Sequence, residues 1–400
     1  MQLKYLKENF FSILIGLYPA ALAAGTAISE TINLILIISF LYKSYSSRNW
    51  KWIKNKTFIF LIIIWFYLII NWLLSNFPDH SFDRAITFIR FPILIFSLIF
   101  FFSEKENSKK IIFNMWFYIL AFLICDLLFE AIMGYNLVGY KSPWPERLSG
   151  MMFGELKIAH LLIGFTLPIL FVKFHNDKNF FKFLLYIIIY ITVLILTGER
   201  SNSIKGVLIV IFSFIFCYKI FIKKILYVFL IIPLFFILIY LKPNLHQRYF
   251  LEISYAWKNN NSSIIKLIEK SNYGPHYLTA IEIFKNYPMF GSGIQTFRIE
   301  CQKKEYSKLN GCTTHPHQIF LELLSELGLI GFFLIITFIF YVSYLATIIY
   351  KKNHNGAVIA STLFILGASL PLIPGGSFFT SFGATIFWIN IAMIIKEQKK

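Results

Sequence analysis

Residues 57–74 read TFIFLIIIWFYLIINWLL and contain no charged side chain. At about 1.5 Å per residue, a helix of this length approaches the roughly 30 Å hydrocarbon thickness of a bilayer. In lipid, such a segment must satisfy its own backbone hydrogen bonds, so we expect it to be helical. This stretch predicts an all-α protein that crosses a membrane.

The composition of the whole chain agrees with that prediction. The chain is 57% hydrophobic and 14% charged, whereas soluble domains carry about 25% charged residues. We expect about twelve transmembrane helices, at residues 9–26, 29–45, 57–76, 84–103, 111–131, 155–174, 180–198, 202–221, 224–241, 328–349, 356–373 and 381–396. Residues 1–241 then hold the first nine spans, 242–316 form one large helical loop, and 317–400 hold the last three spans.

Basic residues recur in alternate connectors between these spans. They gather at residues 4–7, 43–56, 105–110, 173–182, 219–224, 351–352 and 396–400. The positive-inside rule places these segments, and therefore both termini, in the cytoplasm. The loop at 242–316 then faces outward. The net charge of +18 thus reflects orientation in a lipid membrane; a nucleic-acid-binding protein would gather its basic residues on one soluble face.

The large loop rejoins the membrane at Thr314-His315-Pro316-His317. Proline suits the first position of a helix, which would put His317 in the first turn, where the helix dipole favours a neutral imidazole. A neutral imidazole can accept a proton from an attacking hydroxyl. We therefore hypothesise a catalytic His317 with His315 beside it. The alternative is that both are polar loop residues at the membrane interface.

Cys301 and Cys312 precede these histidines. With His315 and His317 they form a formal Cys₂His₂ set, but the gap of ten residues between the cysteines is unlike the usual zinc spacing. Outward-facing cysteines also lie in an oxidising compartment. We therefore favour a Cys301–Cys312 disulfide that pins the loop, and we expect no metal and no other cofactor.

Arg200 follows Glu199 at the outer end of the seventh predicted span. An arginine at this depth is costly without a partner or a function, and its planar guanidinium matches a phosphate or pyrophosphate. The alternative is an interfacial arginine paired with Glu199. Arg147, Arg248 and Arg298 lie in other outer connectors. Together the four predict a cationic outer cavity that attracts a lipid-linked anion.

Other charged residues lie within or beside the spans. Arg90, Asp126 and Glu130 fall inside apolar runs, so we expect them to pair with buried groups. Asp126 and Glu130 share one helical face, and a proton relay is the alternative for these two. Glu322 and Glu326 share one helical face after the histidines. They would orient an imidazole, support the cavity wall or bind substrate; alternatively they form a polar stripe at the membrane edge.

Several outer segments resemble bacterial O-antigen ligases and O-antigen polymerases. The loop run AIEIFKNYPMFGSG at residues 280–293 does so, as does the run from His315 to Gly331 that contains Gln318 and Glu326. The turn at 197–201 resembles the arginine-bearing turn of that family, and residues 147–153 resemble an earlier connector. The turn at Gly291-Ser292-Gly293 lets the backbone approach a ligand, or it is a plain reversal.

The resemblance implies an integral inner-membrane glycosyltransferase with a GT-C-like fold. Such enzymes take a glycan from undecaprenyl pyrophosphate on the periplasmic face and invert the anomeric carbon without a metal. The acceptor is the lipid A core for a ligase, or another lipid-linked glycan for a polymerase. The resemblance assigns the pyrophosphate contact to Arg200 and the role of base, or of acceptor-positioning residue, to His317.

This chain departs from the family pattern at two places. Gln318 stands where Asn or Ser is usual, and residues 273–276 offer no arginine where many members have one. A second pyrophosphate contact would therefore come from Arg147, Arg248 or Arg298. The sequence does not separate ligase from polymerase, and a membrane transporter or flippase remains the alternative function.

Overall fold

The computed structural model of the chain describes residues 7–174, 180–217, 221–259, 269–307, 309–371 and 373–399. Within these ranges the regular elements are all helices, and no strand occurs. The all-α prediction is therefore confirmed for the described part of the chain.

The helices of the first half of the chain are α2 (Phe10–Gly16), α3 (Tyr18–Ala24), α4 (Thr26–Ser46), η1 (Lys51–Lys54), α5 (Lys56–Leu73), α6 (Pro78–Thr87), α7 (Arg90–Phe102), α8 (Ser108–Met133), η2 (Gly150–Met152), α9 (Ile158–Phe174) and α10 (Phe180–Leu196). Those of the second half are α11 (Arg200–Cys217), α12 (Phe221–Leu241), α13 (Pro243–His246), the π-helical η4 (Gln247–Leu251), α14 (Glu252–Asn259), α16 (Gly274–Asn286), α17 (Phe297–Glu300), α18 (Lys304–Ser307), α19 (Ile319–Asn353), α20 (Gly356–Ala368), α21 (Ser381–Lys396) and η5 (Glu397–Lys399).

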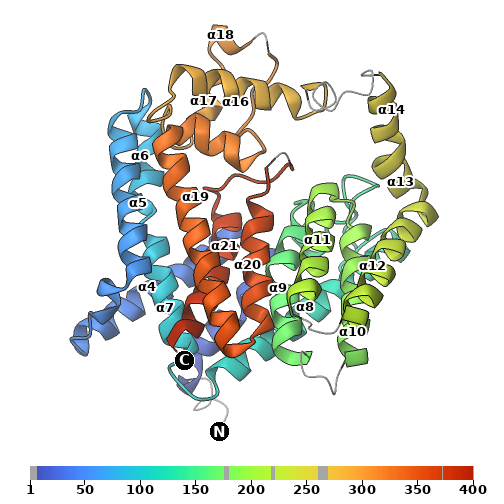
Figure 1. Ribbon diagram of the computed structural model, residues 1–400, viewed down its shortest axis with the longest axis horizontal. Coiled ribbons are helices and arrows are strands. Elements are labelled where there is room, and N and C mark those ends of the chain that lie inside the picture. The colour runs from blue at the N-terminus through green and yellow to red at the C-terminus, as the bar shows by residue number, and fades with distance from the viewer. Residues whose placement is uncertain are drawn as a thin grey trace.

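Each of the predicted spans overlaps one or two of these helices. Six helices in the described residues are long and apolar enough to cross a membrane, or seven if the bent pair Phe229–Tyr240 and Pro243–Leu251 is one span. The fold is that of a polytopic helical membrane protein, while the total of twelve spans stays a prediction. In Figure 1 the loop helices α16–α18 form a layer above the long helices, and both ends of the described chain lie at the opposite end.

Close helix packing at the centre of the bundle depends on glycine. A Cβ at Gly164 of α9 would lie 2.2 Å from the Ile386 side chain of α21. The Ile386 side chain therefore packs directly against the backbone of α9. Asn390 of α21 donates from Nδ2 to the carbonyl of Gly164, at 3.0 Å. Small residues and interhelical hydrogen bonds of this kind hold membrane helices together where apolar burial gives little driving force.

Buried carboxylates tie the connector after α8 to that helix. Asp126 accepts the backbone N–H of Leu137 at 2.9 Å, and Glu130 accepts that of Gly150 at 2.7 Å. Arg90 instead pairs with Glu30 at 3.3 Å. The partners expected for these intramembrane charges are therefore present, and for the two acids they are backbone groups.

Glu322 and Glu326, in the first turns of α19, also accept hydrogen bonds from backbone N–H groups of other segments. Glu322 accepts the N–H of Phe378 at 2.9 Å, and also a hydrogen bond from the Ser377 hydroxyl. Glu326 accepts the N–H groups of Gln295 and Phe297, at 2.7 and 3.2 Å. These two side chains hold the connectors on either side of α19 against the helix.

Helix α19 is broken at Gly328, whose φ of 66° and ψ of −172° are not helical. The loop segment before α17 docks on this break: Leu329 N–H donates to Pro288 O at 2.8 Å, and Gly293 N–H donates to Glu326 O at 3.0 Å. A Cβ at Gly291 would lie 2.3 Å from the Glu326 backbone. The close backbone approach in this turn is therefore to α19 rather than to a ligand.

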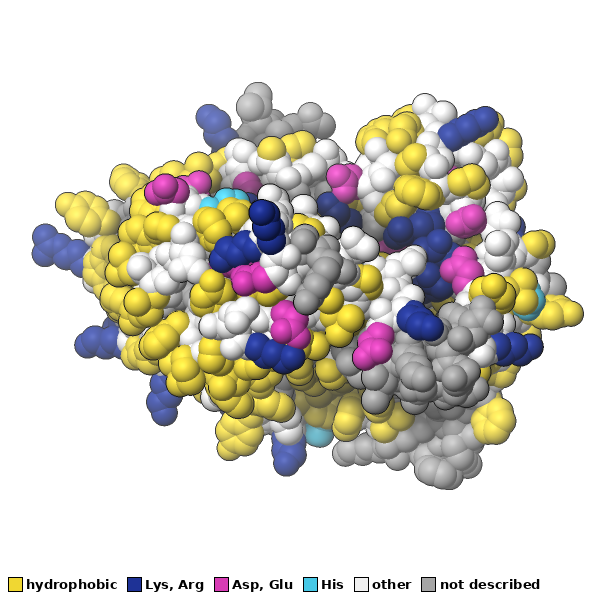
Figure 2. Space-filling model, turned by 90° about the horizontal axis from the view of Figure 1, so that it is seen from above, with side chains coloured by type: hydrophobic (Ala, Val, Ile, Leu, Met, Phe, Trp, Pro, Cys, Tyr) yellow, Lys and Arg dark blue, Asp and Glu magenta, His cyan; other side chains and the backbone are white. Residues whose placement is uncertain are grey.

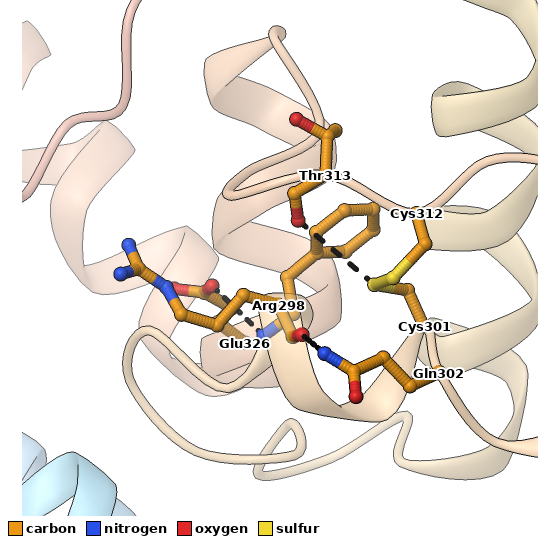
Figure 3. Close-up of a disulfide and its surroundings, with 7 residues drawn as sticks. Arg298, Cys301, Gln302, Cys312, Thr313 and Glu326 are labelled. Carbon is orange, nitrogen blue, oxygen red and sulfur yellow. Dashed lines mark hydrogen bonds between the residues drawn. A yellow bond between two sulfur atoms is a disulfide. The ribbon is translucent and has the colours of Figure 1, made fainter.

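Cys301 and Cys312 form a disulfide in the loop layer. Figure 3 shows the bond beside Thr313, with the Arg298 side chain extending away from it. The sulfur of Cys301 lies 3.9 Å from the Thr313 carbonyl oxygen. The bond thus closes the segment that contains α18 just before the chain reaches the two histidines, and the two cysteines are not available as zinc ligands.

We predict that Gly328→Ala destabilises the protein. The φ/ψ region of Gly328 is accessible almost only to glycine, and a Cβ there would lie 2.4 Å from Met289 O. We expect a loss on the order of 2 kcal/mol or more, measured as a lower melting temperature of the purified protein in detergent. Gly376→Ala is the control, because a Cβ at Gly376 meets no atom within 4 Å. Equal melting temperatures for the two variants would contradict the assignment.

Candidate active site

A cavity of about 740 Å³ opens below the loop layer, within the size range of ligand sites in proteins. Its walls come from the connector before α9, the first turns of α9 and α11, the segment before α17, the approach to α19 and the connector into α21. Figure 2, seen from above, shows Lys and Arg side chains gathered in a hollow of this face. The residues predicted from the sequence that line the cavity are Arg147, Arg200, Arg248, Arg298, His315 and His317.

Two of the arginines, Arg200 and Arg248, are held by contacts between distant segments. Arg200 donates from Nη1 to Arg248 O at 2.8 Å and forms an ion pair with Glu252 at 3.0 Å. Arg248 donates from Nε to Gly198 O at 3.0 Å and lies 3.5 Å from a carboxylate oxygen of Glu146. Because Arg200 pairs with Glu252, the alternative of an Arg200–Glu199 pair is wrong.

Gly198 makes this interlocking possible. Its φ is +68°, and a Cβ there would lie 2.2 Å from Glu146 O, so any side chain would push the two backbones apart. Leu148 N–H donates to Thr197 O at 3.2 Å in the same contact. The turn that carries Arg200 is thereby pressed against the connector that carries Arg147.

Glu199 lies buried beneath these guanidinium groups. Its carboxylate accepts the N–H of Ala159 at 3.0 Å and a hydrogen bond from Asn202 Nδ2 at 2.7 Å. Burial raises the pKa of Glu199 to about 7, although Arg147 and Arg248 oppose that rise. It is the one carboxylate among the described residues that line the cavity, and both of its oxygens are already engaged.

Two of the cavity arginines have unused donors. The Nε atoms of Arg147 and Arg298 are buried and have no hydrogen-bond partner among the described residues. Buried donors are nearly always paired in folded proteins. Unpaired guanidinium donors at a cavity wall are therefore suited to a ligand with acceptor oxygens.

The structure corrects the predicted position of His317. Helix α19 begins at Ile319, and Gln318 caps it by accepting the N–H of Leu321 on its side chain, at 2.6 Å. His317 therefore precedes the cap instead of lying in the first turn, and its φ is +59°. The prediction failed because Gln318 takes up the extended cap conformation, so that Pro316 lies too early to open the helix. Gly375 N–H donates to His317 O at 2.8 Å and holds this conformation.

The imidazole ring of His317 lies beside two other imidazoles and a phenol ring. The centroid of the His317 ring lies 4.1 Å from that of His315, 5.6 Å from that of His276 and 5.2 Å from that of Tyr273. Burial, with His315 and His276 adding to the effect, lowers the pKa of His317 to about 4. The pKa of His315 also falls to about 4, chiefly through burial. A neutral His317 was predicted, but the cause is burial rather than a helix dipole.

The histidines around His317 are not arranged as a metal site. Within the described ranges, no group of three or more His, Cys, Asp or Glu side chains is arranged to bind a metal ion. Glu326, a candidate for substrate binding, does not line the cavity, because its carboxylate is turned toward the backbone N–H groups of Gln295 and Phe297.

Sequence reasoning missed several polar residues of the cavity. These are Arg84, Lys157, His160, Lys205, Tyr273 and Gln295. Lys205 had a usable signal, since it is a lysine inside an apolar span. Seven of the described lining residues are Lys or Arg, so the cavity is strongly electropositive and attracts anions.

The arrangement combines two chemical abilities in one hollow. Arg147, Arg200 and Arg248 can stabilise charge on an oxyanion or a leaving phosphate. The neutral imidazoles of His315 and His317 can accept a proton or orient a hydroxyl.

Comparison with known proteins gives one family likeness. No curated protein sequence matches the chain. Residues 185–336 match the family model described as O-antigen ligase. That segment contains α11, the large loop and the start of α19, and with them Arg200, Arg248, Arg298, His315 and His317. Over residues 185–336, less than half of its length, the chain is therefore similar to the O-antigen ligase family.

Proposed function

We propose that this protein is a membrane glycosyltransferase that moves a glycan from undecaprenyl pyrophosphate to a hydroxyl of an acceptor sugar. One observation carries the proposal: Arg200 and His317, which are far apart in the sequence, line the same electropositive cavity. A pyrophosphate leaving group needs cations, and an attacking hydroxyl needs a proton acceptor.

In the proposed reaction, the acceptor hydroxyl oxygen forms a bond to the anomeric carbon of the donor sugar. Its proton passes to the imidazole of His317. The bond between the anomeric carbon and the pyrophosphate oxygen breaks on the opposite side, and its electron pair leaves with the pyrophosphate, so the anomeric centre inverts. Arg200, with Arg147 and Arg248, stabilises the charge that develops on the leaving group.

Orientation supplies much of the remaining rate in this proposal. Both substrates are anchored in lipid, and a cavity that holds their reacting atoms together converts an encounter of two molecules into a unimolecular step. Arg298 and His315, which line the wall near His317, would bind glycan or phosphate oxygens. We exclude Glu326 from the binding set, because its oxygens are bonded to backbone.

The proposal includes the location of the enzyme. We place it in a bacterial inner membrane as twelve spans with a GT-C-like arrangement, with the large loop of residues 242–316 in the periplasm and both termini in the cytoplasm. Two features support this orientation. Both ends of the described chain lie opposite the loop layer (Figure 1), and the Cys301–Cys312 disulfide of that layer suits an oxidising compartment.

Ligase and polymerase activities share this donor chemistry and differ in the acceptor, which is the lipid A core or a second lipid-linked glycan. Deletion in the native host followed by gel analysis of lipopolysaccharide separates them. Loss of all long chains attached to the core identifies a ligase, whereas core carrying a single repeat unit identifies a polymerase. Unchanged lipopolysaccharide and surface polysaccharide would contradict the proposed function.

We predict that His317→Ala and Arg200→Ala each reduce glycan transfer by about 10²-fold or more, because a general base and a charge-stabilising group are each worth roughly that factor. Transfer is measured in a strain that lacks the native enzyme, with protein levels checked by immunoblot. His354→Ala and Arg48→Ala are the matched controls, since both side chains are exposed and neither lines the cavity. Full transfer by both test variants at normal expression would disprove the mechanism.

The pH dependence of transfer should follow from the pKa of His317, which is lowered to about 4. Imidazole acts as a base only when neutral, and with this pKa it is neutral above about pH 5. We expect kcat/KM to show no imidazole titration between pH 6 and 8 and to fall as the pH drops through about 4. Initial rates with purified enzyme in nanodiscs test this. A decline centred near pH 6.5 would mean that His317 is not the base or is not buried.

Single cysteines introduced into a Cys125→Ser, Cys217→Ser background test the orientation. Lys141→Cys lies in the connector after α8, and Asn49→Cys lies in the connector after α4; both positions are exposed. We expect a membrane-impermeant maleimide to label Lys141→Cys in intact spheroplasts and Asn49→Cys only after lysis. The reverse pattern would refute the periplasmic active site.

A further inference from the structure

Lys205 is a buried cation that the proposed mechanism leaves without a role. It lies within the apolar helix α11 and is 5% exposed. It lines the cavity together with Ser201 and Asn202, which lie four and three residues earlier and so share its helix face. The side chain therefore reaches the cavity from inside the span and not from the loop layer.

The ammonium group of Lys205 has an incomplete set of partners. Nζ donates to Pro374 O at 3.3 Å, and no carboxylate of the described residues lies within ion-pair distance. Three of the six other Lys and Arg side chains that line the cavity differ in this respect: Arg200, Arg248 and Lys157 lie beside Glu252, Glu146 and Glu155. Lys205 is thus deeper than these residues and lacks their counter-charge.

A buried charge without a counter-charge is expensive, and inside a membrane it usually marks a functional site. An ammonium has three donor hydrogens, and one carbonyl accepts only one of them. His160, which lines the same cavity, supplies no negative charge. An anionic ligand at this wall would provide both the missing acceptors and the missing charge.

We propose that Lys205 binds a phosphate oxygen at the inner wall of the cavity, and that this oxygen belongs to the pyrophosphate of the lipid-linked donor. The inference rests on the proposed function for the identity of the donor. Arg200 and Lys205 both line the cavity and are separated by about 7.5 Å along the axis of α11, a spacing that a diphosphate can bridge. The first residues of α11, Arg200, Ser201 and Asn202, line the same cavity, and the positive end of the helix dipole adds to the attraction for phosphate.

The contact between Lys205 and Pro374 gives the site a second property. Pro374 and Gly375 belong to the connector that lines the cavity, and Gly375 N–H holds the backbone of His317. An anion that draws the ammonium away from Pro374 O therefore acts on the same segment that fixes His317. Donor binding and the placement of the imidazole are linked through two adjacent residues.

Binding of inorganic pyrophosphate to the full-length protein in nanodiscs tests the proposal. Lys205→Met removes the charge and keeps the length of the side chain. We expect its Kd for pyrophosphate to rise about tenfold or more, with a weaker dependence on salt. Lys205→Arg should bind within a few-fold of the parent protein. Lys396→Met is the matched control: this lysine is also 5% exposed, but it lies at the far end of α21 against the ring of Phe102.

A second measurement uses the parent protein, so it can be made even if Lys205→Met fails to fold. Pyrophosphate should slow acylation of Lys205 by a small amine-reactive reagent, read by mass spectrometry, and leave Lys396 unaffected. No protection of Lys205, or an unchanged Kd in a folded Lys205→Met variant, overturns the proposal.

Steady-state transfer separates this inference from the proposed function. If Lys205→Met binds pyrophosphate normally but shows a raised KM for a phosphorylated acceptor, the phosphate is that of the acceptor and the assignment to the donor is wrong. If pyrophosphate binding depends on Lys205 but the parent protein transfers no glycan, the anion site stands and the proposed function fails. If the parent protein transfers glycan and Lys205→Met keeps both the Kd for pyrophosphate and the KM for transfer, this inference is wrong while the proposed function stands.

Discussion

The cavity exists because buried carboxylates bind the backbone N–H groups of the connectors around it. In a membrane protein, irregular backbone at depth is tolerated only where its polar groups find partners or line a cavity. Here acidic side chains on or beside the helices supply those partners. The pairs are Asp126 with Leu137, Glu130 with Gly150, Glu199 with Ala159, Glu322 with Phe378, and Glu326 with Gln295 and Phe297. These acids fix the connector between α8 and α9, the segment before α17 and the connector between α20 and α21, and all three contribute residues to the cavity wall.

This use of the acids has an electrostatic consequence. A carboxylate that already accepts two hydrogen bonds, as Glu199 and Glu326 do, is poorly placed to form close ion pairs with the cavity arginines. The carboxylates that do form pairs, Glu146 and Glu252, are nearly half exposed, where water screens the interaction and its net worth is small. An entering anion therefore displaces weak partners. The positive potential of the cavity therefore has two sources. One is the set of arginines and lysines at the site, and the other is that the nearby acids are engaged with backbone groups of the cavity wall.

The sequence predicted the helices well and the cavity only in part, for physical reasons. Apolar runs such as residues 57–74 can be recognised from the local sequence alone, since in lipid a single apolar segment must form a helix. Arg200 and His317 could be found because cations and imidazoles at span ends have few structural uses. Glu326 was given the wrong neighbours, because its hydrogen bonds to Gln295 and Phe297 depend on the break at Gly328, which nothing local announces. Lys205 was missed although a lysine inside an apolar span is itself a signal, and its lack of a counter-charge appears only when α11 and the connector at Pro374 come together.

The two departures from the family pattern have structural explanations. Asn and Ser are favoured helix caps, and Gln318 makes the same kind of bond with a longer side chain by accepting the N–H of Leu321. The start of α19 is thus preserved despite the substitution. At residues 273–276, where the resemblance leads us to expect an arginine, Tyr273 and His276 instead place their rings beside His317. The guanidinium missing there has a counterpart in Arg298, which reaches the cavity from the segment beside the disulfide. A cavity that attracts a diphosphate depends on the summed charge at its walls, so the cations can come from different segments as long as the connectors that carry them are held in place.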